Sequence, residues 1–455
     1  MKKTNDLGKD SIISLVLKLA VPAMMAQLVN VLYTVVDRIF IGNIPLVGDV
    51  ALAGIGVCAP IAEFVSSWGN LIGVGGSVYM AMKMGAKDND EAEKTLSNSF
   101  QALLIMSLVL TAVFLLAKEH LIWWFGASSE TFGYANRYLT IYISGCTFAV
   151  MALGMNYFIS CQGFPAIAML SVFIGAFTNI VLDYVFVMVC GFGVAGAAFA
   201  TVFAQFCSCT WTLMFLFGKK IHIKIKKHAI NLKRLATICK LGLSPFIMYS
   251  TNSVIVIILN VVLQHYGGDV MGDKLITAAA IVQSYVIAIL NPLGGITAGT
   301  QAVISYNYGA KDYRRVIKAF NQITGVAVIF CSVMFVVSRI VPQYVAMMFT
   351  QDAEIISLAS FGMKAFTFGL VPLALHYEAT DGLTAIGMGG TALVMSAFRK
   401  ITFVVLMCII PLFAEAQYVF AYESIGDIAC GLINTVACIF ILRKMLNTKE
   451  LFAKQ

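Results

Sequence analysis

The segment KMGAKDNDEAEKTLSNSFQ at residues 83–101 recurs in outline as NYGAKDYRRVIKAFNQ at residues 307–322. Both copies contain the tetrapeptide GAKD, and the two tetrapeptides are 224 residues apart in a chain of 455 residues. The same offset carries Gly163 onto Gly387. Self-similarity at a fixed offset indicates that the protein consists of one structural unit written twice.

The composition places both units in a membrane. Hydrophobic residues make up 60% of the chain and charged residues 12%, and the mean hydropathy is +0.87. Such a chain has too few polar side chains to cover the surface of a water-soluble protein. Apolar stretches long enough to span a bilayer as helices occur six times in each half, at 14–42, 51–81, 97–117, 134–159, 167–189, 194–217, 240–264, 275–306, 319–341, 354–383, 391–413 and 417–442. We therefore expect an all-α polytopic membrane protein with twelve transmembrane helices.

The loops between these stretches differ in charge. Loops on one side carry most of the basic residues, namely Lys2, Lys3, Lys9, Lys83, Lys87, Lys94, the run from 219 to 234, Lys311, Arg314, Arg315, Lys318, Arg443, Lys444, Lys449 and Lys454. Loops on the other side carry few, mainly Lys118, Arg137, Lys274 and Arg339. Because short basic loops stay in the cytoplasm, the sequence predicts that both termini are cytoplasmic.

An even number of helices per unit predicts that both units insert in the same orientation, related by a pseudo-two-fold axis along the membrane normal. We expect an N-terminal lobe at 1–217, a basic connector at 218–234 and a C-terminal lobe at 235–455, with a cleft between the lobes. The connector alternates apolar and basic residues, so it is expected to lie along the inner leaflet surface.

Several classes of function are disfavoured. The net charge of +8 is spread over many short loops, which is typical of membrane topology and not of a nucleic-acid-binding patch. The eleven cysteines show no metal-ligand spacing, and no nucleophile or phosphate-binding motif occurs. We expect a monomeric protein without cofactors, and not an enzyme.

The predicted spans contain carboxylates, and five of these are candidates for an ion or substrate site. An ionised group in hydrocarbon is costly, so it usually faces a cavity, pairs with another charge or takes up a cation. Within 167–189, Asn179 and Asp183 are four residues apart and therefore share one helical face. An amide oxygen and a carboxylate on one face form half of a site for a hard cation or a proton. The five carboxylates are Asp37, Glu63, Asp183, Glu378 and Asp381.

A polar stripe runs along the first span. Asn30, Tyr33, Thr34 and Asp37 follow one another at helical spacing and so lie on one side of the helix. Thr201 lies in GVAGAAFAT, a run of small residues that allows close helix packing, and can add a hydroxyl group. Asp183 and Asp37 are the predicted centre of an ion site, and the residues leave open whether the ion is H⁺ or Na⁺. The alternative for Asp37 is that it reaches the membrane interface or pairs with Arg38.

Several of these segments resemble the multidrug and toxic compound extrusion (MATE) family, and the similarity covers nearly the whole chain. The family implies two six-helix lobes around a V-shaped cleft and the efflux of cationic or amphiphilic drugs in exchange for H⁺ or Na⁺. The location implied is a bacterial or archaeal-type plasma membrane. The segments are VPAMMAQLVNVLYTVVDRIFIGN at 21–43, SCQGFPAIAMLSVFIGAFTNIVLDYVF at 160–186, GVAGAAFAT at 193–201 and TAGTQAVISYNYGAKD at 297–312.

The resemblance also implies roles for single residues. Residues matching the cation site of the prokaryotic DinF-like branch are Asp37, Asn179, Asp183 and Thr201. Pro22 matches the proline at which the first helix of that branch is proposed to bend. Asn30, Tyr33 and Asn156 match positions that line the cleft. The other prokaryotic branch has a glutamate where this chain has Ser253, which argues against an ion site of that type in the C-terminal lobe.

The second half has its own polar residues. At the 224-residue offset Asp183 falls on Met407, so ion coupling is expected in the N-terminal half. Glu378 and Asp381, together with Glu63 and Gln283, are predicted to line the cleft. His376 lies just before Glu378 in the segment HYEATDG at 376–382. A water-lined polar cluster without a transport role is the alternative interpretation.

Two other functions remain as alternatives. A flippase of lipid-linked precursors shares the duplicated plan but needs basic residues in the cleft, and the basic residues within spans are few, such as Arg38, Arg399 and Lys400. A polytopic enzyme would need an acidic or histidine-containing loop motif. The nearest candidate, GAKDND at 85–90, loses its second acidic residue in the other copy, so a helix-start or turn role explains it better.

Overall fold

In the computed structural model, residues 5–219 and 221–452 are described, and these residues form a two-lobed helical bundle. Lys2, Lys3 and Lys454 of the predicted basic side lie outside the described residues. The N-terminal lobe contains α1 (Ile12–Gly42), α2 (Gly48–Gly85), α3 (Asn89–Trp124), α4 (Phe132–Ser144), α5 (Cys146–Cys161), α6 (Pro165–Asp183), the π-helix η1 (Tyr184–Val189) and α7 (Gly193–Leu216).

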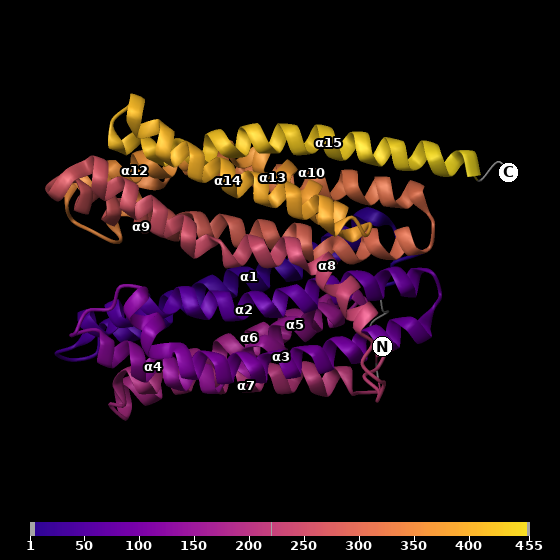
Figure 1. Cartoon of the computed structure of the whole chain (residues 1–455), viewed down its shortest axis with the longest axis horizontal. Coiled ribbons are helices and arrows are strands. Elements are labelled where there is room, and N and C mark those ends of the chain that lie inside the picture. Colours follow the sequence, from indigo (N-terminus) through magenta and orange to yellow (C-terminus); the bar gives the residue numbers. More distant parts are fainter. Residues whose placement is uncertain (1–4, 220, 453–455) are drawn as a thin grey trace.

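The C-terminal lobe repeats this plan and lies beside the first lobe (Figure 1). Its elements are α8 (Leu232–Ser250), α9 (Asn252–Gly309), α10 (Tyr313–Ile340), α11 (Pro342–Met347), α12 (Ala353–Phe366), the 3₁₀ turn η2 (Thr367–Gly369), α13 (Leu370–Ala385), α14 (Gly389–Phe413), the 3₁₀ turn η3 (Ala416–Ala421) and α15 (Tyr422–Phe452).

The described chain contains 11 helices long and apolar enough to cross a membrane, or 12 when one bent pair counts as a span. The bent pair is α4 with α5, at an angle of 53°, and it occupies the predicted span 134–159. Within α9 the helix breaks at Gly268, whose φ is 68°, and this break separates the predicted spans 240–264 and 275–306. The twelve-helix prediction is confirmed.

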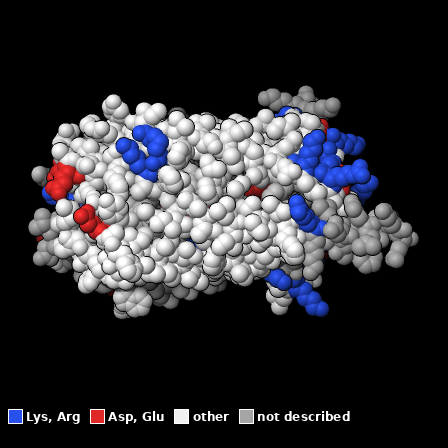
Figure 2. Space-filling view, turned by 90° about the horizontal axis from the view of Figure 1, so that it is seen from above, with Lys and Arg blue, Asp and Glu red and all other residues white. Residues whose placement is uncertain are grey.

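Charged side chains gather at the ends of the bundle. Figure 2 shows a broad, largely uncharged middle, with most of the visible Lys and Arg at one end and a smaller basic group and acidic side chains towards the other. We call this end the basic end. The start of α1 and the end of α15 lie there (Figure 1). A charge-free belt between charged ends fits a bilayer-spanning protein.

The repeated tetrapeptide GAKD is the turn that starts the next helix in each lobe. Asp88 Oδ1 accepts a hydrogen bond of 3.1 Å from the backbone N–H of Glu91, which caps α3. Asp312 Oδ1 accepts one of 3.1 Å from the N–H of Arg315, which caps α10. Lys87 has a left-handed φ of 61° in the first turn, and the second copy has the same conformation. The helix-start interpretation of the motif is confirmed.

The glycines of these turns bring the two lobes into backbone contact. A Cβ on Gly85 would lie 1.9 Å from the carbonyl oxygen of Tyr306, and a Cβ on Gly309 would lie 1.8 Å from that of Met82. Only glycine allows helices α2 and α9 to approach so closely. The contact closes the bundle at its basic end.

A second pair of glycines extends the closure along α2 and α8. A Cβ on Gly75 would lie 2.0 Å from the carbonyl oxygen of Ile238. A Cβ on Gly242 would lie 1.8 Å from that of Leu71. We call the contacts of Gly75, Gly85, Gly242 and Gly309 the glycine seam. Since no side chain separates the helices there, the seam shuts the space between the lobes on the basic side.

Replacing Gly309 with Ala should force the glycine seam open. The new methyl group would overlap a carbonyl oxygen that cannot rotate away, a strain of about 1–3 kcal/mol. Cys161, 3% exposed and on the wall of a cavity between the lobes, should then react faster with a maleimide, measured by peptide mapping. Gly325→Ala is the control, because nothing lies within 4 Å of its Cβ position. Equal Cys161 labelling in both variants would contradict the assigned closure.

The first part of the connector between the lobes packs against the N-terminal lobe. Ile221 and Ile223 are 3% and 5% exposed and belong to the core of the N-terminal lobe. The side chain of Gln162 accepts from Ile223 N at 2.9 Å and donates to Ile223 O at 3.2 Å. Ile221 and Ile223 of the alternating pattern thus face the lobe, whereas Ile230 is 44% exposed, and the position of the connector relative to the inner leaflet stays a prediction.

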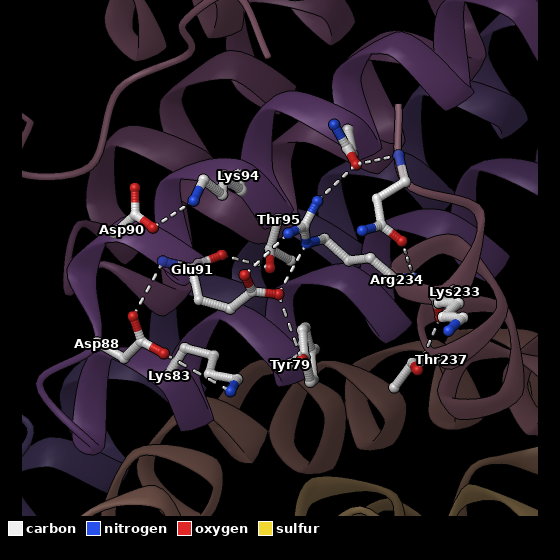
Figure 3. A network of polar contacts seen from close by, with 12 residues as sticks. Tyr79, Lys83, Asp88, Asp90, Glu91, Lys94, Thr95, Lys233, Arg234 and Thr237 are labelled. Atoms are coloured by element: carbon white, nitrogen blue, oxygen red, sulfur yellow. Dashed lines mark hydrogen bonds and ion pairs between the residues drawn. The ribbon is translucent and has the colours of Figure 1, made fainter. Parts of the chain in front are cut away.

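A polar network fixes the end of the connector and the start of α8 (Figure 3). Arg234 of α8 donates from Nε and Nη2 to the two carboxylate oxygens of Glu91 on α3, each at 2.8 Å. Asn98 accepts from Arg234 Nη1 at 2.9 Å and from Asn231 N at 3.0 Å. A bidentate, largely buried pair is a strong and directional contact. The contact between Arg234 and Glu91 connects the first turn of α8, in the C-terminal lobe, to α3 of the N-terminal lobe.

Glu91→Gln should loosen this connection and expose the connector to protease. Loss of a charge-assisted bidentate contact costs about 1.5–3 kcal/mol, so trypsin cleavage within 221–231 should become about tenfold faster or more. Gel analysis of limited trypsin digests measures the rate. Asp90→Asn is the matched control, because the Asp90–Lys94 pair on the same helix is solvent-exposed and contributes little.

The segment before α1 makes the reciprocal contact with the other lobe. Arg315 of α10 donates from Nη2 to the carbonyl oxygens of Leu7 and Asp10, at 3.2 and 2.8 Å. Asn307 Nδ2 also donates to Leu7 O, at 3.1 Å. Each half is thus tied at its first residues to the other half, as expected for a duplicated unit.

Candidate functional site

The four residues of the predicted cation site lie together inside the N-terminal lobe. They come from α1, α6 and α7, and all are buried, with Asp37 9%, Asn179 2%, Asp183 0% and Thr201 8% exposed. Asn179 Nδ2 donates to Thr201 Oγ1 at 3.4 Å. We call these four residues the carboxylate cluster.

The two carboxyl groups of the cluster face each other. Asp37 and Asp183 are within interaction distance of one another. Among the described residues, no hydrogen-bond partner is found for Asp37 Oδ1, for either carboxylate oxygen of Asp183 or for Asn179 Oδ1. Two buried carboxylates cannot both remain ionised without compensation. Their chemistry therefore suits uptake of a proton or of a hard cation that prefers oxygen ligands.

Local structure places Asp183 in the cluster. Asn179 and Asp183 lie on the same face of α6, as their spacing predicts. Directly after Asp183 the helix widens into the π-helix Tyr184–Val189. Such π-turns are uncommon and occur often at functional sites.

Tyr138 is a neighbour of the cluster that the sequence analysis missed. It lies on α4, is 8% exposed and lies near Asp37 and the hydroxyl of Thr201. A tyrosine inside an apolar span is a weak signal, because the ring is also ordinary core content. Only the fold brings α4 beside α7.

A cavity of about 400 Å³ lies beside the cluster, between the two lobes. Asn30, Tyr33 and Asn156, the predicted cleft residues of the N-terminal lobe, line it together with Asn179 and Thr201. Helix α9 contributes the opposite wall with Ser284, Ile287 and Asn291. The volume is in the range of small-molecule sites. Asn179 and Thr201 therefore belong to the cluster and to the cavity wall at once.

A second cavity of about 110 Å³ continues from the first towards the glycine seam. It shares Asn30 and Asn156 with the first cavity and adds Tyr157, Tyr249 and Gln301. Pro22 lies inside α1, which runs as one helix from Ile12 to Gly42. Pro22 lies beside the second cavity, whose wall includes Leu19 and Ala23, and it is nearer than Asn30 to the basic end of α1.

Glu63 connects the two lobes. Its carboxylate accepts from Asn252 Nδ2 at 3.2 Å and from Ser253 Oγ at 3.5 Å. Lys400 Nζ donates to Asn252 Oδ1 at 2.6 Å. These hydrogen bonds connect α2, the start of α9 and α14. Because the carboxylate of Glu63 has hydrogen-bond partners, a structural role for Glu63 is favoured over a role in substrate binding.

The other predicted cleft residues lie in the C-terminal lobe. His376 and Glu378 are 2% and 1% exposed, and His376 Nδ1 is 2.8 Å from Asn434 Nδ2. Neither oxygen of Glu378 has a hydrogen-bond partner. Asp381 is half-buried beside Thr297 and Gln301 of α9. The structure therefore places Glu378 in the lobe interior and not on the wall of either cavity above.

Gln283, also predicted to line the cleft, is half-buried on α9. It lies beside Tyr422 of α15. The structure therefore places this side chain towards the C-terminal lobe.

A buried ion cluster in the same lobe was not predicted. Arg399 Nε donates to Asp427 Oδ1 at 2.7 Å, and its Nη2 donates to Glu423 Oε1 at 3.3 Å. Arg399 is 3% exposed, and its guanidinium lies over the ring of Phe403 at 4.6 Å. The acids at 423 and 427, four residues apart in the last span, are the signal that could have found it.

Comparison with known proteins places this two-lobed fold among multidrug transporters. The chain matches the MatE family over residues 22–185 and 246–410, and it therefore belongs to the MatE, or multidrug and toxic compound extrusion, family. It is 26% identical over 448 residues to multidrug export protein MepA of Staphylococcus saprophyticus, covering 97% of this chain and 96% of that protein.

Further similarity covers the whole chain. MepA of Staphylococcus aureus strain MSSA476 is 26% identical over 454 residues, covering 97% of both proteins. A solved structure described as the outward-facing conformation of a multidrug resistance MATE family transporter of the MOP superfamily superimposes with a TM-score of 0.91. Its sequence identity is 22%, and the match covers 98% of this chain and 100% of that chain.

Proposed function

We propose that this protein exports cationic or amphiphilic organic compounds in exchange for H⁺ or Na⁺ bound at the carboxylate cluster. One observation carries the proposal: Asn179 and Thr201 belong both to the buried cluster and to the wall of the drug-sized cavity. An ion that binds Asp37 and Asp183 therefore changes the charge and the hydrogen bonds felt by a bound substrate. The family membership and the multidrug export proteins among the relatives support the same class of cargo.

The basic end is assigned to the cytoplasm, because basic loops are retained there. The glycine seam closes this end, and Asp37 lies near the opposite end of α1. The structure then corresponds to a state in which the cavity is shut towards the cytoplasm. The plasma membrane is the location that fits export from the cell, and a monomer is sufficient because both lobes belong to one chain.

Alternating access provides the mechanism. The lobes rock so that the glycine seam opens in one state and the outer ends separate in the other. Helix α1 carries Asn30 and Tyr33 on the cavity wall and Asp37 in the cluster, so a change in α1 acts on both sites. Pro22, which lacks an N–H group, is the position at which α1 can bend. Coupling requires that the ion favours one of the two states.

Efflux from proteoliposomes tests the proposal. Purified protein is reconstituted around ethidium, and an inward H⁺ or Na⁺ gradient is imposed separately. Gradient-dependent efflux with one ion is the expected result, and it would identify that ion. Movement of an anionic lipid-linked precursor analogue without ethidium efflux would instead favour the flippase alternative.

A further inference from the structure

The wall of the larger cavity carries one formally charged side chain among its described lining residues, Arg38 of α1. The other polar lining groups are neutral amides and hydroxyls, such as Gln27, Gln205 and Ser208. Asp37, the residue before Arg38, is buried and turned into the cluster. A substrate in the cavity is therefore exposed directly to the positive charge of Arg38. The carboxylates of Asp37 and Asp183 do not line the cavity and affect the substrate only electrostatically.

The guanidinium of Arg38 makes no hydrogen bond or ion pair within the described chain, although its charge acts on the neighbouring carboxylate of Asp37. Arg38 is exposed, and the hydrogen bonds and ion pairs of the described residues do not include its guanidinium. It lies four residues before the end of α1 at Gly42, a rise of about 6 Å. Arg38 therefore lines the cavity near the end of α1 that is opposite the glycine seam.

Charge balance gives this arginine a consequence for transport. With both carboxylates ionised, the cluster and Arg38 together carry one net negative charge, which attracts a cation. One bound cation brings this sum to zero, and two bound protons make it positive. Without Arg38, a singly loaded cluster would remain negative and would continue to attract a cationic substrate.

Resting on the proposed function, we propose that Arg38 is a release residue of the transport cycle. Its charge allows ion loading to cancel the attraction for a cationic substrate, so that the substrate leaves and does not rebind from outside. A unit charge about 10 Å away, at an effective dielectric constant between about 20 and 80, changes the affinity for a monovalent cation about two- to fifteenfold. An uncharged substrate is unaffected.

Inhibition by external substrate tests this role. Ethidium efflux is measured while either ethidium or an uncharged phenanthridine is added to the outside, for wild type, Arg38→Gln and Arg38→Lys. The concentration of external ethidium giving half inhibition should fall about two- to fifteenfold in Arg38→Gln. It should stay unchanged in Arg38→Lys, which keeps the charge. Inhibition by the uncharged compound should be the same in all three proteins.

The outcomes separate the two proposals. No change for ethidium in Arg38→Gln, or an equal change for the uncharged compound, would overturn the role of Arg38 and leave the proposed export intact. Absence of ethidium efflux by the wild type would contradict the proposed function itself. If Arg38→Gln does not transport, ethidium binding to the purified protein is measured by fluorescence anisotropy instead. We expect ethidium to bind Arg38→Gln more tightly than the wild type. Equal binding to both proteins would overturn the role of Arg38.

Discussion

Asp183→Asn should remove ion-driven export while leaving the protein folded. The amide has nearly the same shape as the carboxylate but takes up no proton near neutral pH and has no negative charge to hold a metal cation, so the ion can no longer strongly favour one state of the transporter. Coupling energies between sites are typically about 1–3 kcal/mol, so gradient-driven efflux should fall about 5- to 150-fold. Initial rates of dye efflux from proteoliposomes at a fixed gradient measure the effect.

The matched control for Asp183→Asn is Glu130→Gln. Glu130 is an exposed carboxylate in the loop before α4, so its variant should transport like the wild type. Asp37→Asn should resemble Asp183→Asn, because the two carboxyl groups share the bound ion. Undiminished gradient-driven efflux by both cluster variants would contradict the assignment of the carboxylate cluster as the coupling site.

Arg399→Met should be the most destabilising single change in the C-terminal lobe. It would leave Glu423 and Asp427, 7% and 1% exposed, as two buried carboxylates without a cation. Removal of one partner from a buried ion cluster costs about 3–5 kcal/mol. The purified protein is heated to a series of temperatures, and the fraction that remains folded is measured by size-exclusion chromatography. The temperature of half-unfolding should be much lower than for the wild type.

A compensated variant distinguishes uncompensated charge from lost packing. Arg399→Met combined with Glu423→Gln and Asp427→Asn removes the buried charges, so it should recover most of the lost stability. Lys364→Met is the control, because Lys364 is an exposed cation of the same lobe. If the triple variant were as unstable as Arg399→Met, the loss would come from packing and not from unpaired charge.

Much of the architecture follows from local sequence. The twelve spans can be predicted because a bilayer requires long apolar helices, and the GAKD copies can be assigned to helix starts because Asp88 and Asp312 are capping residues. The proximity of Asn179 to Asp183 follows from helical periodicity alone. These predictions depend on residues close together in the chain.

Contacts between distant segments could not be predicted in the same way. The burial of Ile221 and Ile223 depends on contacts with core residues of the N-terminal lobe that are distant from the connector in the sequence. Glu63 meets Asn252 only because α2 and the start of α9 lie side by side across the lobes. Arg399 finds its partners 24 and 28 residues later, on another helix. Periodicity indicates which face of a helix is polar, but not which helix lies opposite it.

The most direct test of the account is the release of the bound ion when substrate binds to the purified protein. With ethidium added to detergent-solubilised wild type, a pH indicator or bound ²²Na⁺ should report release of the coupling cation, and Asp183→Asn should release none while still binding dye. Equal release by the wild type and Asp183→Asn would contradict the account, as would dye binding to the wild type without release of either ion.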